Sequence, residues 1–415
     1  MIKMNIRLII ALIFFILLDI YAFQAFRGVT KTMSPDLRKV LMFGYWGISA
    51  LAYLLAIAMM ANIITDKNHF LTIYGRTFLM ILFLSKLCAF PILLIDDVRR
   101  GFLAVVNYFM VEKSFNLSRS KFLSGVGVFL GTAPIVALTY GALRNPYRYR
   151  VHRSNIFIDG LHPDLEGFKI VQISDVHSGS FVFKEPILNG IDLINKEKAD
   201  LVVFTGDIVN YKADEMDGLY EIFGKIQTPY KTVFSTLGNH DYGDYYKWDS
   251  KADLDRNFEK IKGIHKTLGW DLMLNEHRIL EHKGAKIGLI GVENFSALPQ
   301  FPKHGDLTKS VEGMPPTDVK ILLSHDPTHW DFEVNKNHQD INLTLAGHTH
   351  GFQFGIEIPG WIKWSPSQFV YKQWAGLYQK GAQYLYVNRG FGFLGYAGRV
   401  GILPEITTLI LTGKK

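Results

Sequence analysis

The sequence predicts an α/β domain over residues 166–415 that follows a membrane-spanning region of about four helices over residues 1–145. The 415-residue chain is 48% hydrophobic and 20% charged, and its apolar residues are concentrated before about residue 145. Beyond residue 166, short apolar runs alternate with polar, helix-like stretches, which is typical of an α/β fold. A basic juxtamembrane linker, 146–165, is expected between the two parts.

Four long apolar segments predict the spanning helices, at 6–26, 40–64, 77–95 and 122–143. A spanning helix needs about 20 mostly apolar residues, and each segment meets or nearly meets that length. The first could be a signal peptide, but we find no small-residue cleavage site and three more segments follow. Asp19 and Lys86 lie inside segments, where charge is costly. Lys86 either marks a pathway or lipid site, or snorkels or pairs locally.

The flanking charges select a membrane side only weakly, because basic residues are nearly balanced between alternate loops. The arginines after the last segment favour placing the α/β domain on the cytoplasmic side of the cell (inner) membrane. Those arginines, with two tyrosines between them, suit the lipid headgroup layer, or they form a simple stop-transfer flank. The formal net charge of +7 suits anionic lipid or phosphate substrates but identifies no partner. A lone cysteine, Cys88, allows no intramolecular disulfide.

In the second part, apolar runs at 168–173, 201–205, 232–237, 319–323, 341–346, 384–388 and 407–411 predict strands, and 279–292 predicts a hairpin turning at Lys283-Gly284. Several runs are continuous rather than alternating, which indicates strands buried on both faces. Helices are expected after Pro186 and over 253–268.

Five fragments rich in metal-ligand side chains stand in order at or near the ends of these runs. They are Asp175-Val176-His177, Gly206-Asp207, Gly238-Asn239-His240-Asp241, Ser324-His325 and Gly347-His348-Thr349-His350. Ligands in such sheets collect beyond the carboxyl ends of the strands, so the fragments should meet at one edge. Carboxylates, imidazoles and one amide suit two divalent metals that share a carboxylate. The glycines are expected to let the backbone turn sharply from strand to loop.

Complete and in order, the fragments resemble the D-x-H, G-D, G-N-H-[DE], H, G-H-x-H pattern of the calcineurin-like metallophosphoesterase superfamily, over residues 168–412. The spanning segments make the chain similar to the bacterial membrane-anchored (multi-span) subgroup. The resemblance implies a four-layer α-β-β-α sandwich and an enzyme that hydrolyses a phosphoester or pyrophosphate bond.

The resemblance also implies roles for residues. One metal would be held by Asp175, His177, Asp207 and His350, and the second by Asp207, Asn239, His325 and His348. Asp207 would bridge two ions, of which Mn, Fe or Zn suit this ligand set best, and a bridging hydroxide would attack phosphorus directly. His240 would protonate the leaving oxygen or stabilise charge on it. Asp241 either orients the His240 imidazole or caps the following loop.

Further residues are candidates for substrate contact. Asn210 could touch a phosphate, and Arg389 could hold one through its guanidinium fork or form an ion pair that anchors its loop. Phe352 stands where the family often has glycine, so pocket shape cannot be borrowed from relatives. The aromatic stretch 361–378 is either a bilayer-touching rim or additional core, with one or two tryptophans exposed.

The membrane bilayer is the expected partner, and a membrane-associated or lipid-linked phosphorylated compound is the expected substrate. One alternative is an anchored phosphatase or phosphodiesterase for soluble substrates, which would stay active when cut free near residue 155. The other is a non-catalytic membrane receptor or scaffold. No basic patch with interleaved aromatics is evident, so no nucleic acid is expected.

Overall fold

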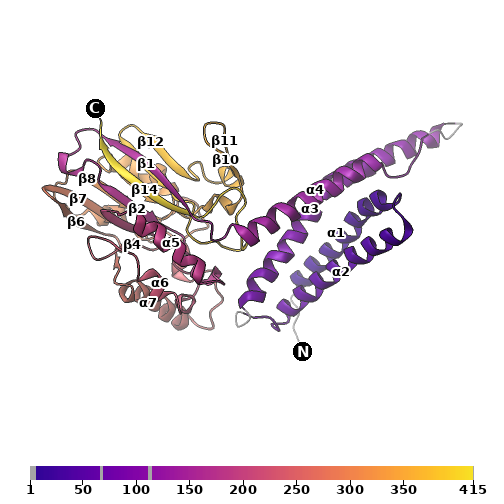
Figure 1. The fold of residues 1–415 in the computed structure, drawn as a ribbon, viewed down its shortest axis with the longest axis horizontal. Helices are drawn as coiled ribbons and strands as arrows, with labels where there is room; N and C mark the ends of the chain where they lie inside the picture. The colour runs from indigo at the N-terminus through magenta and orange to yellow at the C-terminus, as the bar shows by residue number, and fades with distance from the viewer. Residues whose placement is uncertain (1–5, 66–68, 111–114, 415) are drawn as a thin grey trace. The chain divides into compact units, whose positions relative to one another are not determined.

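The computed structural model describes residues 6–65, 69–110 and 115–414, which fall into two compact units (Figure 1). The first unit contains Met1–Leu143 together with Gly395–Ala397. The second contains Arg144–Leu394 together with Gly398–Lys415.

Four long helices form the described part of the first unit, as the apolar segments predict. They are α1 (Ile6–Thr30), α2 (Pro35–Met60), α3 (His69–Phe109) and α4 (Lys121–Arg144), each long and apolar enough to cross a membrane. With 41 residues, α3 extends well past the apolar segment expected at 77–95. The helix continues because Asp96 and Asp97 pair one turn later with Arg99 and Arg100, at 2.9 Å in each case, so these charges are satisfied locally.

A buried ion pair joins α1 to α3. The Nζ of Lys86 lies 2.8 Å from Oδ2 of Asp19, whose side chain is fully buried. From α2, the hydroxyls of Tyr45 and Tyr53 donate to the two carboxylate oxygens of Asp19 at 2.5 and 2.6 Å. Lys86 therefore pairs with a neighbour, and the cluster ties three helices together.

Two six-stranded sheets form the second unit. The first has the order β1 (Arg150–Ile158), β14 (Glu405–Gly413), β2 (Lys169–Ile173), β3 (Leu201–Thr205), β4 (Phe234–Thr236) and β5 (Asp271–Leu272). The second has the order β12 (Gly376–Lys380), β13 (Gln383–Val387), β9 (Leu343–Ala346), β8 (Val319–Leu323), β7 (Ala285–Gly291) and β6 (Glu276–His282). Strands β2 to β5 run parallel to one another, and so do β7, β8, β9 and β13.

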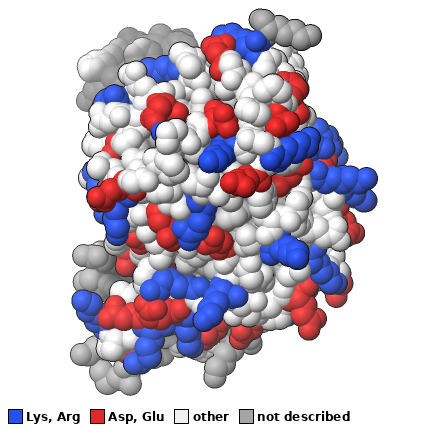
Figure 2. Space-filling view, turned by 90° about the vertical axis from the view of Figure 1, so that its left-hand side faces the viewer, with Lys and Arg blue, Asp and Glu red and all other residues white. Residues whose placement is uncertain are grey.

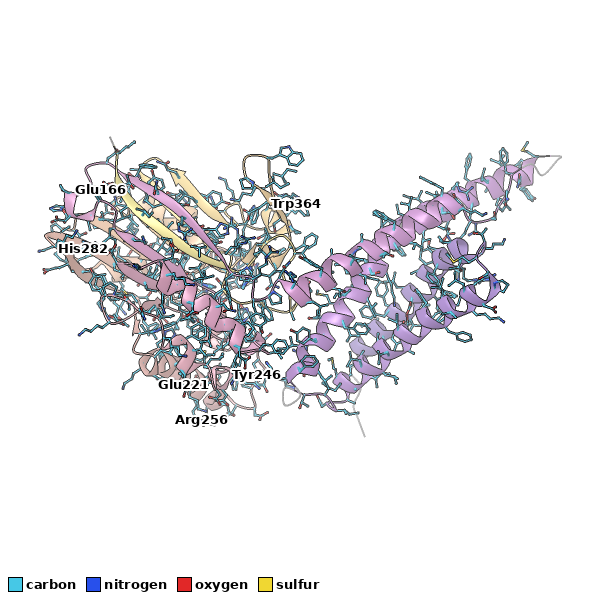
Figure 3. The ribbon with its side chains drawn as sticks, viewed as in Figure 1. Glu166, Glu221, Tyr246, Arg256, His282 and Trp364 are labelled. Atoms are coloured by element: carbon cyan, nitrogen blue, oxygen red, sulfur yellow. The ribbon has the colours of Figure 1, made fainter. Side chains whose placement is uncertain are left out.

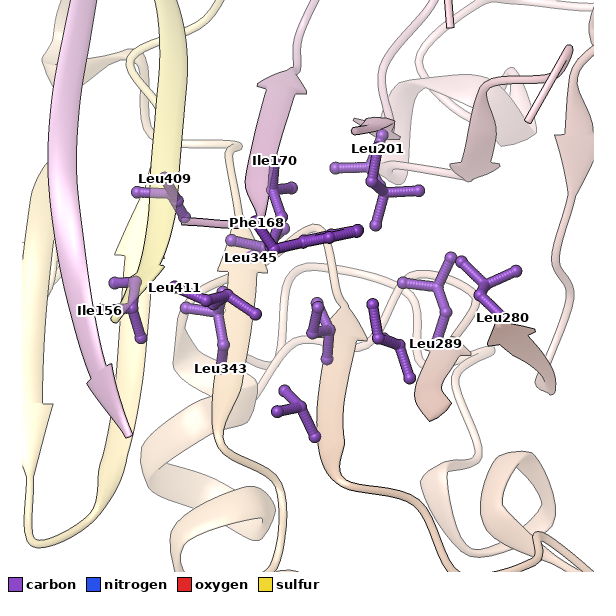
Figure 4. Packing of buried hydrophobic residues seen from close by; sticks show 14 of the residues in the cluster. Ile156, Phe168, Ile170, Leu201, Leu280, Leu289, Leu343, Leu345, Leu409 and Leu411 are labelled. Atoms are coloured by element: carbon purple, nitrogen blue, oxygen red, sulfur yellow. The ribbon is translucent and has the colours of Figure 1, made fainter. Parts of the chain in front are cut away.

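The two sheets pack face to face around one core. Ile170 and Leu201 of the first sheet lie in the same buried cluster as Leu289 and Leu343 of the second (Figure 4). Beyond the first sheet lie α5 (Glu185–Lys196), α6 (Tyr220–Phe223) and α7 (Lys251–Thr267) (Figure 1). The far face of the second sheet packs against α8 (Leu307–Val311) and the turn Trp330–Val334. These four layers are the α-β-β-α arrangement that the resemblance implies.

Residues 150–158, which the sequence assigns to the linker, form strand β1. It pairs with β14 over its whole length, from Arg150↔Glu405 to Ile158↔Gly413. Because β1 is an edge strand, it fully buries only Ile156 and Ile158 and leaves its basic residues outside, so its sequence does not read as a buried strand. A cut near residue 155 would therefore pass through the sheet, and a released domain has to begin upstream of β1.

The aromatic stretch 361–378 divides between interior and surface. Tyr371 and Trp374 are buried in a small cluster with Ala375 and Ile402. Trp361 and Phe369, in contrast, are 77% and 79% exposed. The stretch thus supplies both additional core and a set of exposed aromatic side chains.

We expect acid to destabilise the second unit in part through His265 on α7. Its side chain is fully buried beside Phe204 and Trp270, and burial lowers its pKa to about 3. The unfolded chain takes up this proton near the ordinary pKa of 6.5, so the folded state loses about 1.4 kcal/mol for each pH unit between 6.5 and 3. Above pH 6.5 the neutral ring carries no such penalty.

The measurement is thermal unfolding of the detergent-solubilised chain at a series of pH values, followed by near-UV circular dichroism. His265→Phe keeps the ring contacts and removes the titrating group, so its stability should fall less between pH 6.5 and 4. An equal fall in both proteins would show that His265 contributes nothing.

Candidate metal centre

The five fragments meet where the carboxyl ends of the parallel strands of both sheets come together. Asp175 and His177 follow β2, Asp207 follows β3, and Asn239 follows β4. From the second sheet, His325 follows β8, and His348 and His350 follow β9. All seven sequence-predicted ligands thus stand in loops at the ends of parallel strands, and all but His348 are almost completely buried.

Three of these side chains, Asp175, His177 and His350, form a first group with convergent ligand atoms. The Nε2 atoms of His177 and His350 lie 3.0 Å apart. The same Nε2 of His350 is 3.2 Å from Oδ1 of Asp175, and Nε2 of His177 is 3.6 Å from Oδ2 of Asp207.

Asp207, His325 and His348 form a second group. Oδ2 of Asp207 lies 3.1 Å from Nε2 of His325. Asn239 lies close to Asp207 in the structure. The N–H of the next residue, His240, donates to Oδ1 of Asp207 at 2.8 Å. The amide of Asn239 donates from Nδ2 to the hydroxyl of Tyr245 at 2.9 Å, while its buried Oδ1 has no hydrogen-bond partner among the described residues.

These separations and charges fit divalent ions. Donor atoms that share one ion through bonds of about 2.1 Å lie roughly 3.0 to 3.4 Å apart at tetrahedral or octahedral angles. The separations of 3.0, 3.1 and 3.2 Å lie within this range, and the 3.6 Å between His177 and Asp207 lies just beyond it. Burial alone would lower the pKa of His325, but the carboxylates of Asp207 and Asp175 raise it to about 10, so this position favours positive charge. The unpartnered Oδ1 of Asn239 adds a buried acceptor of the kind a cation would satisfy.

Hydrogen bonds on the outer ring nitrogens orient the histidines. Nδ1 of His325 donates to the carbonyl of Thr205 at 2.7 Å, which leaves Nε2 facing Asp207. Nε2 of His348 lies 2.7 Å from the hydroxyl of Tyr371, so Nδ1 is the ring nitrogen left for a metal. Partners of this kind fix the tautomer and the ring plane of a metal-binding histidine.

The backbone is left-handed at most of the candidate ligands. Positive φ angles occur at Asp175 (53°), His177 (48°), Asp207 (61°), His348 (72°) and His350 (49°). Such angles are uncommon for residues other than glycine, and they cluster at functional sites where the surrounding structure imposes them. They turn each side chain back across the end of its strand.

The glycines of the motifs act in two different ways. Gly206 has a φ of 95°, so it provides the sharp turn expected from the sequence. Gly238 and Gly347 do not have positive φ angles. A Cβ at Gly238 would instead collide with the carboxylate of Asp207, and one at Gly347 would collide with the hydroxyl of Ser174 and the carboxylate of Asp175. These two positions must be glycine because carboxylates pass close to the backbone.

Asp241 binds backbone rather than the His240 imidazole. Its fully buried carboxylate accepts the N–H groups of Asp207, Ile208 and Gly238, each at 2.8 Å. It therefore joins the loop after β3 to the loop after β4. Burial, together with the adjacent charge of Asp207, raises the pKa of Asp241 to about 7. The sequence left two roles for Asp241, orienting the His240 ring or capping a loop. Its bonds to backbone N–H groups correspond to loop capping.

The two candidate substrate contacts are engaged with protein groups. Arg389 donates to Glu357 at 2.6 and 2.9 Å and to Glu405 at 2.5 Å, and its side chain is almost fully buried. This double ion pair anchors the loop, which was the alternative open from the sequence. The side chain of Asn210 bonds to Ser180, and its carbonyl accepts from Nδ1 of His240 at 2.8 Å.

Some residues near the site belong to none of the five fragments, so the sequence did not identify them as site residues. Tyr245 and Tyr371 contact Asn239 and His348, and only their positions in the folded loops reveal it. Arg399 is fully buried, donates to the carbonyls of Arg389 and Gly390, and lies 3.3 Å from Nδ1 of His350.

Phe352, which stands where the family often has glycine, has a φ of 51° and is 48% exposed, so its side chain does not fill the site.

We expect Asp241→Asn to loosen the site without changing any candidate ligand. The amide offers one acceptor oxygen and turns an N–H₂ group toward backbone donors, so the free energy of unfolding should fall by at least about 2 kcal/mol. Metal affinity should fall about 10–100-fold, as for other outer-shell partners. Unfolding by chemical denaturant and metal titration measure both. The exposed Asp255→Asn on α7 is the control, and equal behaviour of the two variants would contradict this role.

Two family models match the chain in sequence. Residues 5–146 match "Probable Calcineurin-like phosphoesterase, transmembrane domain", and residues 168–352 match "Calcineurin-like phosphoesterase". An uncharacterized metallophosphoesterase of Bacillus subtilis, YkuE, is 29% identical over 301 residues, covering 71% of this chain and 98% of that protein.

Two further bacterial relatives are similar over most of their own length. An uncharacterized metallophosphoesterase of Campylobacter jejuni, Cj0846, is 26% identical over 388 residues, 91% of this chain and 93% of the relative. A protein of Escherichia coli named phosphodiesterase YaeI is 25% identical over 304 residues, 71% of this chain and 99% of the relative. Together with the geometry above, these matches show that the chain belongs to the calcineurin-like metallophosphoesterases, metal-dependent phosphoesterases, in the form that carries a four-helix transmembrane region.

Proposed function

We propose that this chain uses two divalent metal ions to hydrolyse a phosphoester or pyrophosphate bond in a membrane-associated or lipid-linked substrate. The position of Asp207 is the observation that carries the proposal. Its Oδ2 lies 3.6 Å from Nε2 of His177 in the first group and 3.1 Å from Nε2 of His325 in the second. One carboxylate is therefore within reach of both groups, as a bridging ligand has to be.

In this proposal Asp175, His177, Asp207 and His350 hold one ion, and Asp207, Asn239, His325 and His348 hold the other. The mixture of imidazoles with oxygen ligands suits Mn, Fe or Zn. When bound, such ions supply an activated water molecule and offset charge on the phosphorus oxygens. Tyr245 orients the Asn239 amide, and Thr205 orients the His325 ring, so that the ligand atoms keep their directions.

His240 is assigned to the leaving group. Its Nδ1 is held by the carbonyl of Asn210, which leaves Nε2 free to face a substrate. Burial lowers the pKa of His240, with Asp207 acting in the opposite direction. A bound phosphate anion would raise that pKa again. The protonated ring could then donate to the leaving oxygen or stabilise charge on it.

A substrate in or at the membrane is supported by the short connection between the two parts of the chain. α4 ends at Arg144, and β1 begins at Arg150. An anchored enzyme for soluble phosphoesters is the alternative, and a non-catalytic receptor or scaffold is a weaker one because no ligand position is missing. On the face shown in Figure 2, acidic and basic side chains are interspersed, which does not favour a nucleic acid.

We further propose that the protein resides in the cell (inner) membrane with its catalytic domain in the cytoplasm. The support is the run of basic residues directly after α4, since cytoplasmic flanks are enriched in Lys and Arg. Arg144, Arg148, Arg150 and Arg153 form that run.

We expect Asp207→Asn to abolish hydrolysis of a generic aryl phosphodiester and an aryl phosphomonoester by the detergent-purified chain in Mn²⁺. The amide cannot supply the bridging negative charge, so the loss should exceed the roughly 10–100-fold that an outer-shell partner causes. Rates and bound metal are measured side by side, with Asp255→Asn as control. Turnover that persists in Asp207→Asn, or wild-type protein that binds no metal, would contradict the proposal.

We expect His240→Gln to lower kcat by about 10²–10⁴-fold while both ions stay bound, because the ring acts on the leaving group and not on metal. Elemental analysis of the purified variant gives the metal content, and steady-state kinetics give kcat. Loss of an ion in His240→Gln would instead identify the ring as a ligand.

A further inference from the structure

The small hairpin formed by β10 (Ile356–Ile358) and β11 (Ile362–Trp364) has an apolar face turned outward and a charged face turned toward the domain. Ile356 faces Trp364 and Ile358 faces Ile362 across the pair, so these four side chains share one face. The charged pair of the hairpin lies on the opposite face. There, Glu357 accepts from Arg389, and Lys363 donates to the carbonyl of Ala375. Charges therefore point toward the domain, and Ile356 and Ile358 are exposed.

Exposed apolar side chains gather on and next to this hairpin, which projects from the edge of the domain and carries Trp364 (Figures 1 and 3). We name the following set the hairpin patch: Phe352, Phe354, Ile356, Ile358, Trp361, Phe369 and Val370. Elsewhere in the described part of the second unit, the large hydrophobic side chains of comparable exposure are Phe157, Phe183, Tyr245, Tyr246 and Phe332. Contiguous exposed apolar surface marks an interaction site.

A tight turn holds the tryptophan of the patch at the tip of the hairpin. The N–H of Trp361 donates to the carbonyl of Ile358 at 3.0 Å, with Pro359 and Gly360 between them. Gly360 has a φ of 76°, which is the type II turn that a Pro-Gly pair favours. The Trp361 side chain is 77% exposed. Tryptophan prefers the boundary between lipid and water.

Hydrogen bonds connect the base of the hairpin to the chain that leaves α4. The helix ends at Arg144, and the next residue, Asn145, donates from Nδ2 to the carbonyl of Arg399 at 2.8 Å. The carbonyl of Val400 then accepts the N–H of Gly355 at 2.9 Å, directly before β10. Two hydrogen-bonded steps thus separate the residue that follows the last spanning helix from the hairpin.

A pocket of about 810 Å³ lies behind the hairpin, between it and the edge strand β1. Its lining combines the basic side chains Arg150, His152 and Lys363 with the apolar side chains Val151, Ile358, Trp361, Ile362 and Leu403. Arg389 also lines the pocket, but Glu357 and Glu405 offset its charge. Arg150 forms no ion pair with any residue of the described ranges. The pocket therefore joins uncompensated positive charge to apolar wall, which matches an anionic amphiphile.

We propose that the hairpin patch rests in the headgroup and upper acyl layer of the bilayer crossed by α4, and that the pocket behind it binds the phosphate headgroup of an anionic lipid. Trp361 and its apolar neighbours contact lipid, while Arg150 faces the phosphate. This contact orients the domain on the membrane whether or not the metal centre turns over a lipid substrate.

Spin labels on the full-length chain in lipid nanodiscs test the contact. In a Cys88→Ser background, one label is attached at Trp361→Cys and a matched label at Phe157→Cys. Phe157 is an exposed aromatic residue on the same strand as Arg150 but roughly 23 Å further along it. Collision rates with oxygen, which concentrates in lipid, and with a water-soluble nickel chelate are compared.

The oxygen-to-chelate ratio should be severalfold higher at position 361 than at 157. Equal ratios would overturn the proposal, and so would a label at Ile358→Cys that reports only water. All three positions are exposed, so the substitutions open no cavity. The readout is independent of hydrolysis, so its failure is distinguishable from failure of the proposed function.

The headgroup is tested by comparing nanodiscs of phosphatidylcholine with nanodiscs that also contain phosphatidylglycerol. The label at 361 should move deeper with the anionic lipid, and Arg150→Gln should remove that difference. No difference between the two lipids would overturn the headgroup assignment. If excess inorganic phosphate reversed the deepening, the pocket would be a site for free phosphate, and the lipid assignment would also be overturned.

Discussion

The buried carboxylate of Asp241 holds together the two loops on which the metal centre depends. It gathers backbone N–H groups from Asp207, Ile208 and Gly238, so the turns after β3 and β4 cannot move apart. In return, the N–H of His240 donates to the carboxylate of Asp207. Each loop thus positions the other's acidic side chain, and Asp207 is held between the two ligand groups. The buried carboxylates of Asp207 and Asp241 repel each other. Backbone N–H dipoles and nearby imidazoles offset this repulsion.

The sandwich must also support strained backbone. Left-handed angles at five candidate ligands cost of order 1–3 kcal/mol each, which persists only where the surroundings over-determine the conformation. The surroundings here are two sheets packed through a continuous apolar core, with the site at their common carboxyl edge. Rigid strands fix where each loop begins, and glycines at 238 and 347 leave room for the carboxylates that cross them.

Much of the fold could be predicted from the sequence because the central strands are buried on both faces. The runs at 201–205 and 319–323 coincide with β3 and β8, and the hairpin turning at Lys283-Gly284 joins β6 to β7. The candidate ligands could be predicted because the motif fixes residue types at strand ends. Edge strand β1 could not be predicted, because it is exposed along much of its length and carries arginines there. Its sequence therefore lacks the apolar run of a buried strand. The bonding of Asp241 and Arg389 could not be predicted either, because most of their partners lie 16 or more residues away in sequence. An aspartate or arginine can equally well bind substrate, anchor a loop or orient a ring, so residue type alone does not decide.

During synthesis, α1 leaves the ribosome well before α3, so Asp19 reaches the membrane when Lys86 has not yet been made. The hydroxyls of Tyr45 and Tyr53 arrive next with α2 and can solvate the carboxylate, but they bring no positive charge. A lone carboxylate inside a bilayer is costly. Asp19 is therefore expected to need contact with water or with other protein groups until α3 delivers the ammonium group of Lys86. The ion pair makes complete insertion of the third helix a condition for stable insertion of the first.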